Sequence, residues 1–247
     1  NSGWHNLYAW MHPHVHTPTE TGSKMAHSQL TSRQRGFTLV EIAVVLVIIG
    51  LLLGGVLKGQ ELINSAKVKS LINDCRNVAT FAYAYQDRFR ALPGDDAGAA
   101  SHLSGGVKAS TGGTAGNGRI EGNWNSTTAT DESVLFWQHV RLANLASGDG
   151  RNPGLEGLVI LDWLPRNAAG GRTGITGVAP ITGWAGNFFV CQDNIPGSLA
   201  RQVDIAMDDG QPAAGSVRLL ANGSASGSAV ALADLADGTP YTVCAAL

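Results

Sequence analysis

The sequence predicts an α+β fold, in which a long N-terminal helix packs on an antiparallel β-sheet flanked by short accessory helices. Three observations predict this class. A nearly uncharged run extends from Gly36 to Leu57, a segment with helical periodicity continues it to about residue 90, and short β-type segments are spread through the second half of the chain.

The composition argues against some classes of function. The chain of 247 residues has a formal net charge of −2, and only 15% of its residues are charged, so no strongly basic face for nucleic acid is expected. The 32 glycines and the aromatic content of 6% suit a secreted, loop-rich domain better than a cytosolic enzyme.

The first element is an apolar helix that is long enough to cross a membrane. From Gly36 to Leu57 only Glu41 is charged, and about 22 helical residues span the ~30 Å hydrocarbon core of a bilayer. The run has no Ala-x-Ala site of the kind that follows a secretory signal peptide, so we expect it to be retained. A carboxylate inside an apolar helix costs about 2–3 kcal/mol, which predicts a partner or a function for Glu41. The alternative is a plain anchor whose glutamate reaches the membrane interface.

The helix is expected to continue beyond the membrane with one apolar face. From Phe37 to about Arg90 it would be roughly 80 Å long, and Pro93-Gly94 would end it. Its apolar positions recur every three or four residues: Val68, Leu71, Ile72, Cys75, Val78, Ala79, Ala82, Tyr85 and Phe89.

The string Arg35-Gly36-Phe37-Thr38-Leu39-Val40-Glu41 before the apolar run resembles the N-terminal signature of type IV prepilins and of the related pseudopilins of type II secretion. The resemblance covers about a tenth of the chain. It implies cleavage between Gly36 and Phe37 by a prepilin peptidase and N-methylation of Phe37. The new amino group would lie about one helical turn from Glu41, and a charge pair within one chain or between neighbouring subunits would offset the cost of both charges. Glu41 is therefore expected to set subunit register.

The resemblance also implies a division of the chain into segments. Two arginines, Arg33 and Arg35, precede the apolar run and favour a cytoplasmic leader and an exported C-terminal part. Three alternating histidines (His12, His14 and His16) have the spacing of metal ligands, but extra sequence upstream of a start at Met25 is the preferred interpretation. The expected segments are an upstream extension (1–24), a prepilin leader (25–36), a transmembrane and assembly helix (37–57), its amphipathic continuation (58–92) and an exported globular domain of the pilin-like class (93–247).

The exported domain is expected to contain a long loop, two helices and several strands. Residues 94–125 are rich in small residues and predict a long ordered loop or small hairpins. The predicted helices are 131–146, capped by Thr130 and stopped by Gly148, and 196–207. Trp137 and His139 on the first helix are interpreted as packing residues. The predicted strands are 158–161, 187–191, 216–220 and 241–244.

Three cysteines leave one thiol unpaired in an oxidised, exported chain. Cys191 and Cys244 lie in strand-like segments, so a disulfide between them is preferred; it would close a loop of about 54 residues and stabilise the fold by ~4 kcal/mol. Cys75 lies on the apolar face of the long helix and is expected to be a buried thiol.

The carboxylates offer one candidate for metal binding. The resemblance allows Ca²⁺, which some pseudopilins bind, and the candidate ligands are Asp204, Asp208 and Asp209, with Asp234 and Asp237 further along the chain. Their spacing is not that of an EF-hand, so a capped helix end followed by a turn at Asp209-Gly210 is the preferred interpretation. Asp95 and Asp96 are likewise interpreted as turn residues.

No catalytic motif is present in the sequence. It has no Gly-x-Ser-x-Gly, P-loop, His-Glu-x-x-His or Cys-x-x-Cys, and the glycine-rich pieces at 112–113 and 116–118 lack the strand and helix that would form a phosphate cradle. We therefore expect a structural subunit and not an enzyme, with no cofactor other than the candidate Ca²⁺.

The resemblance predicts a minor pilin or a pseudopilin of a type IV pilus or a type II secretion pseudopilus. The expected location is the bacterial inner membrane with the C-terminal domain in the periplasm, and then the filament. The implied partners are the prepilin peptidase, other pilin subunits, the inner-membrane assembly platform and the membrane itself, with no nucleic acid. The alternatives are a membrane-tethered binding module of the adhesin type, which would use the 94–125 loop or the strands after residue 158, and an anchored periplasmic enzyme.

Overall fold

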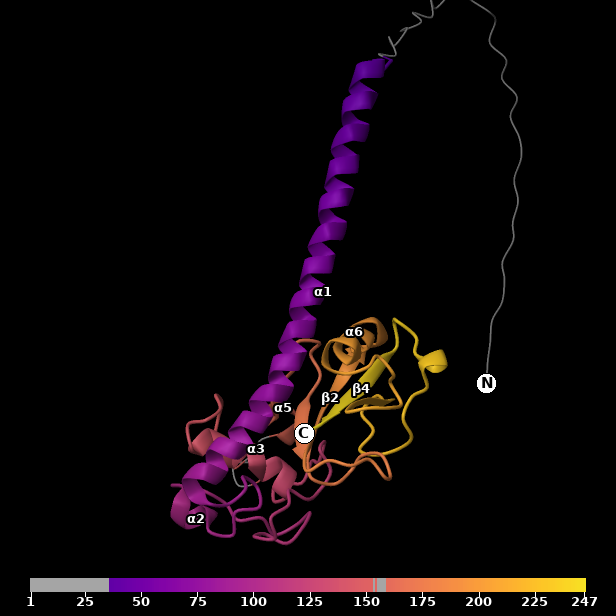
Figure 1. Cartoon of the computed structure of the whole chain (residues 1–247). Helices are drawn as coiled ribbons and strands as arrows, with labels where there is room; N and C mark the ends of the chain where they lie inside the picture. The colour runs from indigo at the N-terminus through magenta and orange to yellow at the C-terminus, as the bar shows by residue number, and fades with distance from the viewer. Residues whose placement is uncertain (1–35, 153, 155–158) are drawn as a thin grey trace, which may run out of the picture. The chain divides into compact units, whose positions relative to one another are not determined.

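The computed structural model describes residues 36–152, 154 and 159–247 (Figure 1). The chain divides into two compact units, Asn1–Gly50 and Leu51–Leu247. The long helix α1 (Leu39–Phe89) contributes its first turns to the first unit and the rest to the second. The expected extension and most of the expected leader, including Met25 and the three histidines, lie outside the described residues.

The sequence predicted the extent of α1 closely. The helix ends at Phe89, and the next residue, Arg90, has a φ of 56°, in the left-handed region that terminates helices. Within the second unit one face of α1 is buried, at the spacing expected for an amphipathic helix. The buried residues are Val68, Leu71, Ile72, Cys75, Val78, Ala82 and Tyr85.

The second unit contains a four-stranded sheet in which every neighbouring pair is antiparallel. The strand order is β1-β2-β4-β3, so β1 and β3 form the edges. The strands are β1 (Thr173–Thr176), β2 (Phe189–Pro196), β3 (Val217–Ala221) and β4 (Pro240–Ala246). This sheet and the long helix confirm the predicted α+β class.

The predicted strands at 187–191, 216–220 and 241–244 correspond to β2, β3 and β4, but the prediction at 158–161 was wrong. Ile160–Trp163 forms the short helix α5, and residue 158 is outside the described part of the chain. Strand β1 was missed because it has only four residues, one of them glycine, and lies between the glycines at 170–171 and Gly177. A Cβ atom at Gly174 would lie 1.9 Å from the main-chain oxygen of Trp124, so this glycine allows the two backbones to approach.

Helices cover one face of the sheet. α3 (Glu132–Leu142) contacts β1, and α6 (Gly197–Met207) contacts β2, β3 and β4. The main hydrophobic core lies between these helices, the second half of α1 and the sheet. Gln192 on β2 donates one hydrogen bond to the main-chain oxygen of Leu71 and another to the Cys75 sulfur, which fixes α1 on the sheet.

Loops cover the opposite face, which contains the disulfide. Cys191 and Cys244 lie directly opposite each other on β2 and β4 and form the expected disulfide bond. Trp124, Trp184 and Phe189 pack around it in a second, smaller core. Cys75 is a free, buried thiol, as predicted.

Two details of the middle of the chain differ from the prediction. The N-cap position of helix α3 is Asp131, not Thr130, and the helix ends at Leu142 instead of Ala146. It ends early because Asn144 adopts a φ of 58°, and the N–H of Leu145 bonds to the oxygen of Val140 in a Schellman motif. Residues 94–125 form the long loop, interrupted only by the short helix α2 (Ala99–His102) and without hairpins. Near the end of the chain, a 3₁₀ turn, η1 (Leu232–Asp234), precedes β4.

Candidate functional site

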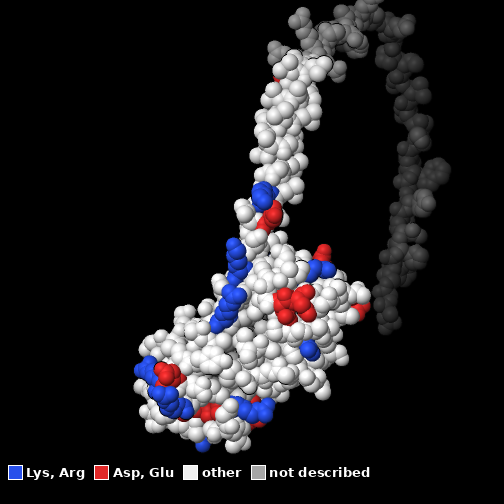
Figure 2. Space-filling view, viewed as in Figure 1, with Lys and Arg blue, Asp and Glu red and all other residues white. Residues whose placement is uncertain are grey.

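The first half of α1 presents apolar side chains in every direction. Among the described residues α1 is the single helix long and apolar enough to cross a membrane, and none of its most apolar 18-residue stretch is buried. Leu39 is 87% exposed and Leu51 is 73% exposed. On the face that Figure 2 shows, this segment is almost free of charged side chains. A continuous apolar surface of this size calls for a lipid or protein environment.

Glu41 forms a capping box with Thr38 at the start of α1. Its Oε2 atom accepts hydrogen bonds from the Thr38 main-chain N–H at 2.8 Å and from the Thr38 hydroxyl at 2.9 Å. In return the Glu41 N–H donates to the Thr38 Oγ1 at 3.2 Å. The reciprocal bonds satisfy donors that a helix start otherwise leaves unpaired. The motif Thr-x-x-Glu could have been read from the sequence, but it was not.

The expected cleavage point lies immediately before this cap. Gly36 and Phe37 are both exposed and precede the helix, and Phe37 is 82% exposed. All hydrogen bonds to the Glu41 carboxylate from the described residues reach Oε2, which leaves Oε1 with no hydrogen bond. Glu41 can therefore keep its cap and still accept a bond from a cation outside its own chain.

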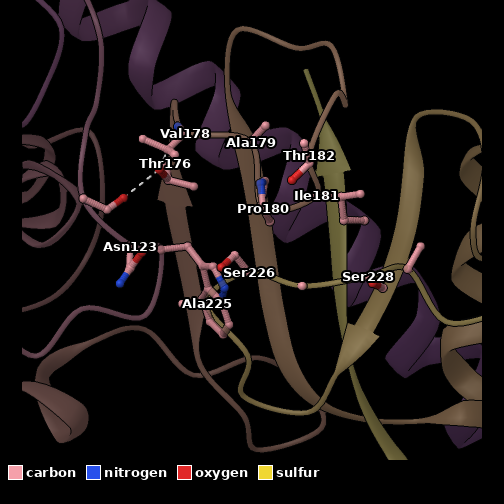
Figure 3. A pocket seen from close by; sticks show the side chains of 14 residues that line it. Asn123, Thr176, Val178, Ala179, Pro180, Ile181, Thr182, Ala225, Ser226 and Ser228 are labelled. Atoms are coloured by element: carbon pink, nitrogen blue, oxygen red, sulfur yellow. Dashed lines mark hydrogen bonds between the residues drawn. The ribbon is translucent and has the colours of Figure 1, made fainter.

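The second unit has an open groove beside the sheet, with a volume of about 640 Å³. Three segments line it: residues 122–124, 176–182 and 225–229 (Figure 3). Its walls are held together by hydrogen bonds: the Thr176 hydroxyl donates to the main-chain oxygen of Gly122, and the Gly227 N–H donates to the main-chain oxygen of Pro180. The lining consists mostly of small, hydroxyl or amide residues, so the groove suits a polar ligand.

Asp95 occupies an anion-binding loop within its own chain. Its carboxylate accepts the main-chain N–H groups of Gly116, Asn117 and Gly118. Consecutive N–H groups of this kind form an anion-binding nest, and here the anion is supplied by the protein. The glycine-rich piece at 116–118 therefore serves the fold, and Asp95 is a buried structural residue where the sequence indicated only a turn.

Asp96 and His139 connect the end of α1 to α3 and the following loop. The buried Asp96 carboxylate accepts bonds from the Tyr85 hydroxyl and from the Gly98 N–H, and its Oδ2 lies 2.7 Å from His102 Nδ1. His139 is fully buried: its Nδ1 accepts from the Gly94 N–H, so its Nε2 donates to the Val107 oxygen. Burial lowers the pKa of His139. It is a neutral packing residue, as interpreted from the sequence.

Glu132, in the first turn of α3, is the most unusual acid of this region. It is 0% exposed, its Oε2 accepts the Glu121 N–H, and its Oε1 has no hydrogen-bond partner in the structure. Burial raises its pKa to about 7, and the nearby charges of Asp95, Glu121 and Asp131 act in the same direction. No sequence signal marks this burial, because an acid after a helix cap is normally exposed.

The end of α6 brings together three of the acids named from the sequence. One carboxylate oxygen from each of Asp204, Asp208 and Asp209 lies within 4.8 Å of the others. Burial, followed by the charges of Asp209 and Asp208, raises the pKa of Asp204 to about 6. Asp234 and Asp237 are not members of this cluster, and the Asp237 carboxylate pairs with Arg201 at 3.4 Å.

Among the described residues, an α+β domain follows an apolar helix that is long enough to cross a membrane, which is typical of proteins anchored through such a helix. Residues 31–57 match the family model of the prokaryotic N-terminal methylation motif, which is the signal of type IV pilins and pseudopilins. The chain therefore carries the type IV pilin and pseudopilin signal, which points to a membrane-anchored structural subunit and not to an enzyme. No curated protein and no solved structure shows significant similarity to the chain.

Proposed function

We propose that this chain is a structural subunit, a minor pilin or a pseudopilin, of a type IV pilus or a type II secretion pseudopilus. A prepilin peptidase cleaves it between Gly36 and Phe37, and the new N-terminus at Phe37 is methylated. Before assembly the subunit resides in the inner membrane with its C-terminal domain in the periplasm. The assembly platform then builds it into a filament through the first half of α1.

One observation carries the proposal: the methylation motif at 31–57 coincides with a helix surface that the described protein leaves uncovered. A membrane covers this surface before assembly, and neighbouring apolar helices cover it afterwards. The second half of α1 supports the proposal, because its apolar face is already buried in its own domain and only the first half is left for contacts with other subunits. A plain anchor would explain the apolar surface but not the motif.

Glu41 provides the specificity of assembly in this proposal. Its Oε2 holds the capping box and its Oε1 remains available. A neighbouring subunit's Phe37 amino group placed on Oε1 would pair two charges in a low dielectric, where each alone is unfavourable. Only one stagger of the subunits brings these groups together, so the pair sets the register.

The experiment compares Glu41→Gln with Glu41→Val in cells that carry the prepilin peptidase and the cognate filament machinery. Glutamine keeps an oxygen for the Thr38 cap and loses the charge, whereas valine loses both. We expect both variants to insert in the membrane and both to be strongly depleted from sheared filaments. Thr38→Val, which loses the cap and keeps the charge, is the matched control and should be incorporated. Normal incorporation of Glu41→Gln would contradict the charge-pair role.

The groove beside the sheet favours a second candidate, a membrane-tethered binding module of the adhesin type. The groove lies between the two regions considered for binding, because residues 122–124 belong to the long loop and residues 176–182 begin at the last residue of β1. Ser226→Trp would fill the groove, which Figure 3 shows with Ser226 on its wall. If binding is the function, this variant loses adhesion of the cells to their target surface while filament incorporation is unchanged; unchanged adhesion would reject the candidate.

A further inference from the structure

Beyond its apolar half, α1 carries a row of exposed side chains that its own domain does not cover. Leu62, Lys69 and Arg76 follow each other at intervals of seven residues, about two helical turns, so they lie on one face of the helix. All three are exposed, Leu62 at 62%. Lys58, about one turn before Leu62, is paired with Glu61. Neither Lys69 nor Arg76 belongs to an ion pair of the described residues. Figure 2 shows basic side chains along this part of α1. We call Leu62, Lys69 and Arg76 the basic face of α1.

The end of α6 presents an exposed face of the opposite charge. Ile205 is 62% exposed, and one carboxylate oxygen of Asp208 lies within 4.8 Å of one of Asp209. A Cβ atom at Gly210 would lie 2.9 Å from the Ile205 side chain, so the turn that carries the two acids lies beside Ile205. Figure 2 shows acidic side chains gathered over α6. We call Ile205, Asp208 and Asp209 the acidic face of α6.

The acidic face lacks a positive partner in its own chain. The neighbouring Asp204 is 0% exposed, and both of its carboxylate oxygens are buried without a hydrogen-bond partner, which is strongly unfavourable for a charged group. Arg201, also on α6, directs its Nη2 atom to the Leu235 oxygen and to Asp237. No ion pair of the described residues includes Asp204 or the two acids of the face. A cation from outside the chain would offset this unpaired charge.

We propose that the basic face of α1 in one subunit docks on the acidic face of α6 in the next subunit of the filament. This inference rests on the proposed function and names a contact that the exported domain makes during assembly. Each face has an exposed aliphatic side chain, Leu62 or Ile205, close to its unpaired charges. Packing these two side chains together removes apolar surface from water, and it brings the cations of one copy to the carboxylates of the other.

Two different faces of one chain give a contact that repeats. A copy that docks its basic face on one neighbour still offers its acidic face to another, so the contact is heterologous, and it builds an open helical filament when its rotation does not close a ring. It is separate from the Glu41 pair, which lies in the apolar half of α1. Exposed ion pairs add little affinity, but they orient the partners and reject wrong pairings. The two faces therefore select the orientation of neighbouring domains.

A second copy of this chain fits the two faces better than a membrane or a soluble ion does. Anionic lipid headgroups would pair with Lys69 and Arg76, but they would repel the acids of α6 and leave them without a partner. A soluble cation would neutralise the acids and leave the basic face unpaired. Contact between copies pairs the charges of both faces and covers both exposed aliphatic side chains at once.

Charge reversal tests the contact in the full chain, in cells that carry the prepilin peptidase and the cognate filament machinery. Lys69→Glu and Asp209→Lys each place like charges opposite each other, so we expect incorporation into sheared filaments to fall about fivefold or more. The combined variant, Lys69→Glu with Asp209→Lys, restores opposite charges and should recover most of the incorporation. Lys108→Glu makes the same change at an exposed lysine of the long loop and is the matched control, with incorporation unchanged.

A cross-link locates the contact. Leu62→Cys combined with Ile205→Cys, oxidised in intact filaments, should give a ladder of covalent multimers, and neither substitution alone should give one. No ladder, or normal incorporation of Lys69→Glu, would overturn the inference and leave the proposed function standing. Filaments that loosen in EDTA but not in high salt would assign the acids to a metal ion, and weaker membrane association of Lys69→Glu without rescue by the combined variant would assign the basic face to lipid; either result would also overturn it. A parent chain that forms no filaments would remove the proposed function, and the inference with it.

Discussion

The two halves of α1 are built from similar residues and meet opposite surroundings. From Leu39 to Leu57 apolar side chains point in all directions and none is buried, whereas from Val68 to Tyr85 a single stripe is apolar and is buried against the rest of the domain. The periodic half needs one partner surface, and its own domain provides it. The uniform half needs a partner on every side, which only a membrane or a bundle of other helices provides. The pattern of apolar residues thus distinguishes the half that packs on its own domain from the half that needs an external apolar environment.

Loss of the disulfide should have the largest effect on the domain and none on the apolar half. The double variant Cys191→Ala/Cys244→Ala releases a link across 53 residues of sequence, and we expect the free energy of unfolding to fall by about 4 kcal/mol. Chemical denaturation measures the free energy of unfolding. Cys75→Ser is the control: it keeps the disulfide, so dithiothreitol should still destabilise it. Extraction from membranes should not change. A reduced parent chain as stable as the oxidised one would contradict the assignment.

A pair of leucine variants tests the comparison directly. Leu71→Ala removes a fully buried side chain from the main core and should lower the free energy of unfolding by about 2–5 kcal/mol. Leu51→Ala removes an exposed side chain, 73% accessible, and should leave domain stability within about 0.5 kcal/mol of the parent chain. Denaturation followed by tryptophan fluorescence measures both. Similar losses in the two variants would mean that the first half is packed on the domain after all.

The buried Glu132 should make domain stability depend on pH. Its pKa is raised from 4.5 to about 7, so between these pH values the folded chain binds more protons than the unfolded chain, and stability falls as the pH rises. The full effect, present above pH 7, is about 3 kcal/mol. The difference in Tm between Glu132→Gln and the parent chain isolates this residue: it should be small at pH 4 and should grow in favour of the variant up to pH 8. A constant difference would contradict the raised pKa.

The capping box should have the smallest effect, confined to the start of the exposed half. Thr38→Val removes the hydroxyl that both donates to Glu41 Oε2 and accepts the Glu41 N–H. We expect a loss of about 1 kcal/mol in the first helical turn. Hydrogen exchange in detergent should show faster exchange at the Glu41 N–H, with Thr80→Val on the second half as control. Unchanged exchange at Glu41 would show that the cap contributes little.

Local patterns were sufficient to predict the main elements. The periodicity of α1, the β-type residues of β2, β3 and β4, and the proline before α6 each act within a few residues, and each was read correctly. The run at 158–161 was misread because a short apolar run fits a strand and a buried helix equally well. β1 was missed because Gly174 is there for the approach of the Trp124 backbone, a contact that sequence order does not reveal.

The buried acids could not be predicted in the same way. Asp95 and Glu132 carry residue types that are normally exposed, and they are buried because loop N–H groups from 116–121 reach them. Asp204, Asp208 and Asp209 were named from the sequence as neighbouring acids. The complete burial of Asp204 was not predicted, because it depends on how α6 packs on the sheet. The apolar half of α1, in contrast, could be predicted from its own residues, because no other part of the described chain packs against it.

The central claim, that the chain is cleaved before α1 and assembles through the first half of that helix, is tested most directly by the intact mass of the protein. The chain is recovered from membranes and from sheared filaments of cells that carry a prepilin peptidase, with a Gly36→Leu variant as the unprocessed reference. The account predicts a mass that begins at Phe37, with or without one added methyl group. A mass that still includes residues 25–36 would contradict it and would make α1 a plain anchor.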